Sequence, residues 1–133
     1  RRFFLDANRT RVEQLHQRGK KVLKHCCGNT TKLLDMFVEI GYDAYQSIQH
    51  SAGVDICEVK KTHGDKMTLW GGVPVESILD GTPDDVRKHV QRSMQCTKPG
   101  GRFILGTSHS IAVGSIYENY MAMLDEYHKH CDY

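Results

Sequence analysis

Residues 19–29, GKKVLKHCCGN, form the segment from which the fold can be worked out. Glycines flank a short run that predicts a β-strand over residues 21–26. Because successive side chains of a strand point to opposite faces, His25 and Cys27 share one face and Cys26 points the other way. The segment therefore places an imidazole and a thiol side by side at the carboxyl end of a strand.

The same order of helix, glycine and short apolar run recurs along the rest of the chain. It predicts helices over residues 3–17, 31–40, 55–62, 83–96 and 116–128, and strands over residues 21–26, 44–48, 67–73 and 102–106. Strands that alternate with helices indicate an α/β fold, with parallel strands joined by right-handed crossovers. This pattern fits a small open sheet and half of an eight-stranded barrel equally well.

A second group of polar side chains, GTSHS at residues 106–110, follows the last predicted strand. Ligands of parallel α/β folds bind at the carboxyl ends of the strands, where His25, Cys27 and His109 would all lie. In a flat sheet, three strand spacings would separate the two clusters by roughly 14 Å, whereas a barrel would bring them to one mouth. Imidazole and thiolate are typical zinc ligands, so a barrel and a metal site support each other. The alternative is a histidine packed beside an apolar cysteine, with His109 packed under the last helix.

Gly71 and Gly72 follow Trp70 without any phosphate-binding glycine motif after them. A tight turn at the end of a strand is the simpler interpretation of this pair. Close approach of a ligand, which would make Gly71 and Gly72 cofactor-binding residues, is the alternative.

The composition excludes several classes of protein. A net charge of +2 without a basic block gives no indication of nucleic-acid binding. The apolar runs are far too short to span a membrane, and no secretory leader is evident. Five cysteines, two of them adjacent, make a poor disulfide framework and predict free thiols in a reducing cytoplasm. In particular, Cys57, Cys96 and Cys131 are expected to be packing residues on helices.

With these clusters in place, the chain resembles the uroporphyrinogen decarboxylase superfamily. This superfamily includes the decarboxylase itself, methylcobalamin:coenzyme M methyltransferases and corrinoid-dependent demethylases. The matching blocks lie, in order, at residues 19–29, 33–35, 39–44, 49–53, 64–66, 70–73, 81–83, 100–105, 108–111 and 118–119. The resemblance implies the C-terminal half of a TIM (β/α)₈ barrel, with four parallel β/α units. Residues 1–133 are accordingly expected to form a single partial domain that lacks the N-terminal half.

The resemblance also implies an activity. The methyltransferase branch carries His-x-Cys-Gly at this strand end, matched here by His25, Cys27 and Gly28. A further ligand near the last strand is usually a cysteine, and His109 occupies that place. We therefore expect a zinc-dependent methyltransferase that works with a corrinoid (methylcobalamin) partner, with His25, Cys27 and His109 as catalytic residues and metal ligands.

Two alternatives stay open on the sequence alone. The second hypothesis is decarboxylation of a tetrapyrrole without a cofactor, in porphyrin biosynthesis. The decarboxylase branch has a histidine at the position of His109, which supports this hypothesis. Its histidine is flanked by glycines, however, whereas Ser108 and Ser110 flank His109. The third is a non-catalytic half-barrel that pairs with another copy of itself as a homodimer. Expected partners are thus a corrinoid protein or a small-molecule methyl donor or acceptor, and the N-terminal half or a second copy. The chain alone is expected to be inactive.

Overall fold

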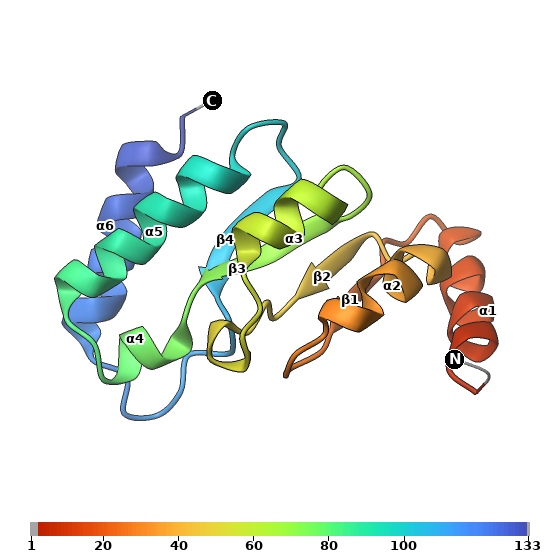
Figure 1. Ribbon diagram of the computed structural model, residues 1–133, viewed down its shortest axis with the longest axis horizontal. Coiled ribbons are helices and arrows are strands. Elements are labelled where there is room, and N and C mark those ends of the chain that lie inside the picture. Colours follow the sequence, from red (N-terminus) through yellow and green to blue (C-terminus); the bar gives the residue numbers. More distant parts are fainter. Residues whose placement is uncertain (1–2, 133) are drawn as a thin grey trace.

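The computed structural model describes residues 3–132 and forms half of a TIM barrel, as the sequence predicts. Four strands make one parallel sheet in the order β1-β2-β3-β4, so each strand pairs with the next one along the chain (Figure 1). The strands are β1 (Leu23–His25), β2 (Ala44–Gln46), β3 (Thr68–Val73) and β4 (Phe103–Thr107). All four carboxyl ends therefore lie at one edge of the sheet.

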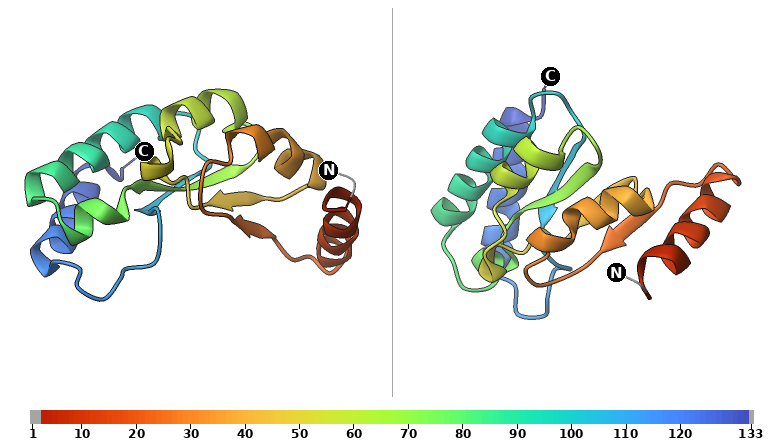
Figure 2. Two further views of the ribbon diagram at one scale, coloured as in Figure 1. Left: turned by 60° about the horizontal axis from the view of Figure 1, so that its bottom comes forward. Right: turned by 45° about the vertical axis from the view of Figure 1, so that its right-hand side comes forward.

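Helices connect the strands and cover one face of the sheet, as Figure 2 shows for α2, α3 and α5. The helices are α1 (Leu5–His16), α2 (Leu34–Ile40), α3 (Ile56–His63), α4 (Val75–Leu79), α5 (Pro83–Thr97) and α6 (Tyr117–His130), with 3₁₀ turns η1 (Thr31–Leu33) and η2 (His50–Ala52). The short α4 was not predicted, because Pro74 and Gly81 bracket a segment too short to show a helical repeat. No helix among the described residues is long and apolar enough to cross a membrane.

Side chains cap the starts of two helices. Thr82 and Asp85 form a reciprocal capping box at the start of α5, and Pro83 occupies its first turn. The carboxylate of Asp55 accepts hydrogen bonds from the backbone of Cys57 and Glu58 and so caps α3. These local signals fix where the helices begin.

β2 is shorter than predicted because of Ile48. This residue has a φ of 56°, a left-handed conformation that β-branched side chains rarely adopt, although it is only 3% exposed. The chain therefore leaves the sheet after Gln46, and residues 47–49 turn along the edge where the strands end.

The outward face of the sheet forms a core with the helices. Tyr45 and Leu69, both 0% exposed, pack there with Phe37 of α2. Lys24, an awkward residue for a strand interior, also faces this side and places its Nζ 5.4 Å from the ring centroid of Phe4. A cation over an aromatic face is a favourable contact, which accounts for the lysine.

The inward face of the sheet, opposite the helices α2, α3 and α5, is exposed to solvent. The strand register aligns His25 with Gln46, Gln46 with Trp70, and Trp70 with Ile104, so these four side chains form one row across it. Trp70 and Ile104 are 38% and 47% exposed, and Leu23, two residues before His25, is 42% exposed. Half a barrel thus leaves its apolar lining open to solvent.

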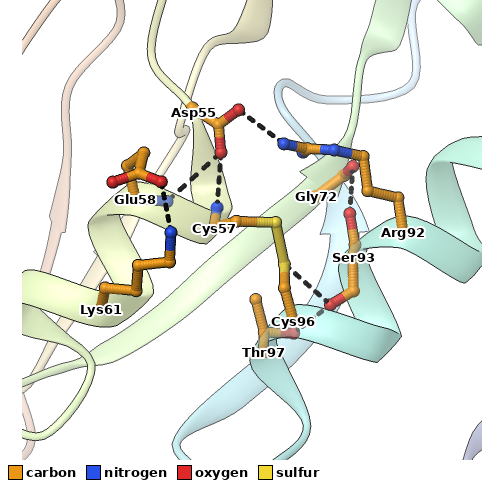
Figure 3. The surroundings of a disulfide bond; sticks show 9 residues. All are labelled: Asp55, Cys57, Glu58, Lys61, Gly72, Arg92, Ser93, Cys96 and Thr97. Atoms are coloured by element: carbon orange, nitrogen blue, oxygen red, sulfur yellow. Dashed lines mark hydrogen bonds and ion pairs between the residues drawn. A yellow bond between two sulfur atoms is a disulfide. The ribbon is translucent and has the colours of Figure 1, made fainter.

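The prediction of free thiols is wrong for two cysteines. Cys57 of α3 and Cys96 of α5 form a disulfide, with Cα atoms 5.5 Å apart (Figure 3). The sequence could not show this pairing, because the partners are 39 residues apart and meet only when both helices pack on β3. Cys26, Cys27 and Cys131 are free. A cytoplasmic location stays a prediction, and the bond counts against it because disulfides are rare in reducing compartments.

An ion pair beside the disulfide links the same two helices. Arg92 of α5 donates to the carboxylate of Asp55 at 2.6 Å, and Ser93 donates through Oγ to the carbonyl of Gly72 at 2.7 Å (Figure 3). Together these contacts tie α5 to the start of α3 and to the carboxyl half of β3.

We predict that reduction of the Cys57–Cys96 bond destabilises the protein. Closing a loop of this length restricts the unfolded chain, so its loss should lower the free energy of unfolding by about 2–4 kcal/mol. Urea denaturation with and without dithiothreitol measures the difference. A double variant, Cys57→Ser with Cys96→Ser, should be insensitive to the reductant, whereas Cys131→Ser should keep the wild-type response. Equal stability of the wild type in both conditions would contradict the bond.

Asp43, just before β2, holds the opposite edge of the sheet together. Its carboxylate accepts hydrogen bonds from Lys21 Nζ at 2.8 Å and from the backbone N–H of Val22 at 2.8 Å, and lies 2.7 Å from the His16 ring. Burial alone would raise the pKa of Asp43, but these partners outweigh it and hold the pKa at about 2. The start of β1 is thereby fixed to the start of β2.

This network predicts a loss of stability in acid. The folded pKa of Asp43 lies below its ordinary value of 3.8, so its contribution is complete above about pH 4 and is lost as the pH falls toward 2. We expect a loss of about 1–2 kcal/mol, since the side chain is partly solvated. Denaturation curves between pH 2 and 5 should show a shallower pH dependence for Asp43→Asn than for wild type. Parallel curves would contradict the assignment.

Candidate metal centre

His25 and Cys27 lie at the carboxyl end of β1 and point to the inward face of the sheet. His25 Nε2 is 3.2 Å from Cys27 Sγ. Cys26 points the other way and packs against the core, in accord with strand alternation. Gly28 follows with a φ of 84°, a left-handed conformation that suits glycine and turns the chain away just after the two side chains.

His109 reaches the same place from the loop that follows β4. Its ring centroid is 5.9 Å from that of His25, with the two rings nearly perpendicular. One ligand atom from each of His25, Cys27 and His109 lies within 4.8 Å of the other two. The structure therefore brings together the three residues singled out in the sequence, far closer than three strand spacings of a flat sheet would allow.

The geometry suits a zinc ion. In tetrahedral coordination, Zn–N and Zn–S bonds place a nitrogen and a sulfur about 3.6 Å apart, and the 3.2 Å between His25 Nε2 and Cys27 Sγ is close to this. All three side chains are exposed, so small rotations can close the remaining distances. Three protein ligands leave a fourth position open, as in catalytic zinc sites.

Gln46 of β2 contacts both His25 and the strand end that leads to His109. The sequence did not single it out as a site residue. Its Oε1 meets Nδ1 of His25, and its Nε2 donates to the carbonyl of Thr107 at 3.4 Å. Thr107 Oγ1 in turn donates to the carbonyl of His109. The available signal was alternation within the strand over residues 44–48, but the register that pairs Gln46 with His25 is not visible in the sequence.

Further hydrogen bonds tie the loops at this edge together. Ser47 donates through Oγ to the carbonyl of Ser108 at 2.5 Å, and the Gly28 N–H donates to Oε1 of Gln49 at 2.8 Å. The segment after β2 therefore holds the loops that carry Cys27 and His109.

Gly71 and Gly72 do not form a turn, because both lie within β3. A Cβ on Gly71 would come within 2.8 Å of the Ser47 carbonyl oxygen, and one on Gly72 within 2.9 Å of Ser93 Oγ. The absence of side chains thus lets β2 and α5 approach β3. A cofactor-binding role for the pair stays a prediction.

Two other histidines pair with each other. His50 meets His89 of α5 edge to face, with ring centroids 5.8 Å apart. His89 is partly buried, and burial lowers its pKa, with His50 adding to the effect. Among the described residues, only His25, Cys27 and His109 form a group able to hold a metal.

A hollow of about 520 Å³ lies at β4, and His109 is the one candidate ligand among its described lining residues. Gln46 and Trp70 of the inward face line it together with apolar residues of α6. A separate hollow of about 430 Å³, between β4 and α6, contains none of the three ligands. The first hollow therefore offers space next to His109.

A half-barrel with a histidine–cysteine cluster at its carboxyl edge belongs to the class of (β/α)₈ proteins with a site at the mouth. The family model described as uroporphyrinogen decarboxylase (URO-D) matches residues 1–130, and the chain belongs to this family. Among proteins with curated descriptions, none matches by sequence.

The fold is also similar to that of a methyltransferase from Methanosarcina mazei, with a TM-score of 0.75 and 20% sequence identity. The match covers 93% of this chain and 36% of the methyltransferase. The chain thus spans little more than a third of that protein's length, and at this identity the likeness establishes the fold.

Proposed function

We propose that this chain supplies the metal-binding half of a zinc-dependent methyltransferase that works with a corrinoid partner. The observation that carries the proposal is the convergence of the ligand atoms of His25, Cys27 and His109 to within 4.8 Å. Membership of the URO-D family and the structural likeness to a methyltransferase support it.

The side chains define what the site can do. His25 and His109 would bind as neutral imidazoles and Cys27 as a thiolate, so binding requires the loss of the thiol proton. Zn²⁺, when bound, would supply Lewis-acid activation of a substrate thiol or ether oxygen at the open position. Trp70 and the apolar wall of the adjoining hollow would hold the rest of the substrate and exclude water.

The corrinoid would carry the methyl group on its cobalt. In transfer to a thiol, the corrinoid would supply the methyl group and keep the electron pair of its cobalt–carbon bond, the thiol sulfur would take the methyl group, and the thiol proton would be released. A corrinoid protein, or a small-molecule methyl donor or acceptor, is the partner that this reaction requires.

Charge favours this reaction over tetrapyrrole decarboxylation. Binding the carboxylates of a tetrapyrrole calls for basic side chains, yet the hollow beside the site has no lysine or arginine among its described lining residues. Lys24, the basic residue nearest in sequence to His25, faces the opposite side, over Phe4. Decarboxylation therefore stays the alternative to be tested.

We predict about one zinc per chain in the purified protein and its loss in Cys27→Ala, because removing the thiolate leaves only two ligands. Inductively coupled plasma mass spectrometry after gel filtration measures the metal. Cys131→Ala is the matched control, since Cys131 is a free cysteine outside the cluster and its variant should keep the zinc.

Absence of zinc from the wild type, after reconstitution with excess Zn²⁺ and removal of the unbound metal, would overturn the metal site. Porphyrinogen turnover by metal-free protein that contains a complete barrel would establish the decarboxylase instead.

We further propose that the bare face of the sheet is covered by a complementary half-barrel, either an N-terminal half or a second copy. Trp70 and Ile104 expose apolar surface there, and on one side β1 and β4 have no strand partner. Unpaired strand edges and apolar surface both favour association. The structural match covers only 36% of the Methanosarcina mazei methyltransferase, which is in accord with a complementary half.

We predict that the 133-residue chain by itself forms a dimer in solution, as measured by multi-angle light scattering. Ile104→Lys should weaken the dimer by placing a charge on the inward face. Val113→Lys is the control, because Val113 is fully exposed in the loop after β4 and is not part of the sheet. A monomer at all concentrations would refute self-pairing, and a 1:1 complex with a separate N-terminal half would assign that half as the partner.

A further inference from the structure

We infer that Gln46 is a positioning residue that fixes the tautomer and orientation of His25, so that Nε2 presents its lone pair to the metal position. This inference rests on the proposed function for its purpose, but the hydrogen bonds behind it exist without a metal.

The backbone carbonyl of Thr107 sets the orientation of the Gln46 amide. The carbonyl oxygen of Thr107 has no proton to donate, so the amide atom facing it at 3.4 Å must be the NH₂ nitrogen. The other end of the amide, which faces His25, is therefore the oxygen. The protein backbone thus decides which way the amide points.

The amide oxygen of Gln46 sets the tautomer of His25. Gln46 Oε1 can only accept, so Nδ1 of His25 must carry the proton that joins them. In a neutral imidazole the other nitrogen, Nε2, is then an acceptor, and it is the atom that lies 3.2 Å from Cys27 Sγ. A lone pair on Nε2 beside a thiol that can lose its proton is the state that a metal requires.

Gln46 also links His25 to the segment that carries His109. Gln46 and His25 are direct partners in the β1–β2 register, so their contact is built into the sheet. Thr107, the other partner of Gln46, hydrogen-bonds through its side chain to the backbone of His109. One amide therefore orients the ring of one ligand and holds the segment that carries another.

The test begins with the metal-free protein. Nitrogen-15 NMR of the histidine rings should show His25 protonated mainly at Nδ1 in the wild type. In Gln46→Met, which keeps the length of the side chain without its hydrogen bonds, the proton should redistribute toward Nε2. His50, whose ring contacts His89, provides an internal reference that should not change.

Zinc affinity gives the second measurement. Competition with a chromophoric chelator should show a Kd about 10- to 100-fold weaker for Gln46→Met, the usual effect of losing a partner that orients a metal-bound histidine. Gln46→Glu restores an acceptor oxygen opposite Nδ1 and should restore the Nδ1-protonated tautomer of His25, although it cannot donate to the Thr107 carbonyl. Gln95→Met, at an exposed position on α5, should match the wild type.

The outcomes separate the two proposals. Zinc binding by the wild type with an unchanged Kd and an unchanged tautomer in Gln46→Met would overturn the role of Gln46 and leave the metal site standing. A tautomer that depends on Gln46 in a protein that binds no zinc would support the positioning role while refuting the proposed function. Failure of Gln46→Glu to restore the Nδ1-protonated tautomer would also count against the inference.

Discussion

Parallel pairing of the four strands sets where every other part of this structure lies. It places every carboxyl end at one edge and aligns His25, Gln46, Trp70 and Ile104 in a single row on the inward face. Helices cover the opposite face, where Tyr45 and Leu69 are fully buried. The chemistry and the core are thereby assigned to opposite sides of the same short strands.

The end of β2 is the point at which the site is assembled. Gln46 reaches across β3 to the last residue of β4, Ser47 reaches the loop that follows β4, and Gln49 holds the turn at Gly28. This crossing requires close backbone approach, which Gly71 allows because a Cβ there would meet the Ser47 carbonyl. The left-handed Ile48 belongs to the same turn. Ile48 thus places a rare backbone conformation at the edge of the sheet that carries the candidate metal centre.

Helices cover one face of the sheet, and the other face is exposed to solvent. Outside, the Cys57–Cys96 bond and the Asp55–Arg92 ion pair join α3 to α5 over β3. Inside, Trp70 and Ile104 are exposed, and β1 and β4 are the edge strands of the described sheet. The three candidate ligands lie on this same exposed side.

Two features of this chain can be predicted from local sequence: the alternation of strands and helices, and the shared face of His25 and Cys27. Both depend on local chemistry and on the period of a strand. The sequence also singled out His109 as the residue that a barrel would bring to the same mouth. Folding in three dimensions was needed to establish the distances between the three ligands, the contacts of Gln46, the role of Gly71 and Gly72, the short α4 and the pairing of Cys57 with Cys96. Each of these depends on strand register or on helix packing between segments far apart in the chain, and no local pattern of residues records them.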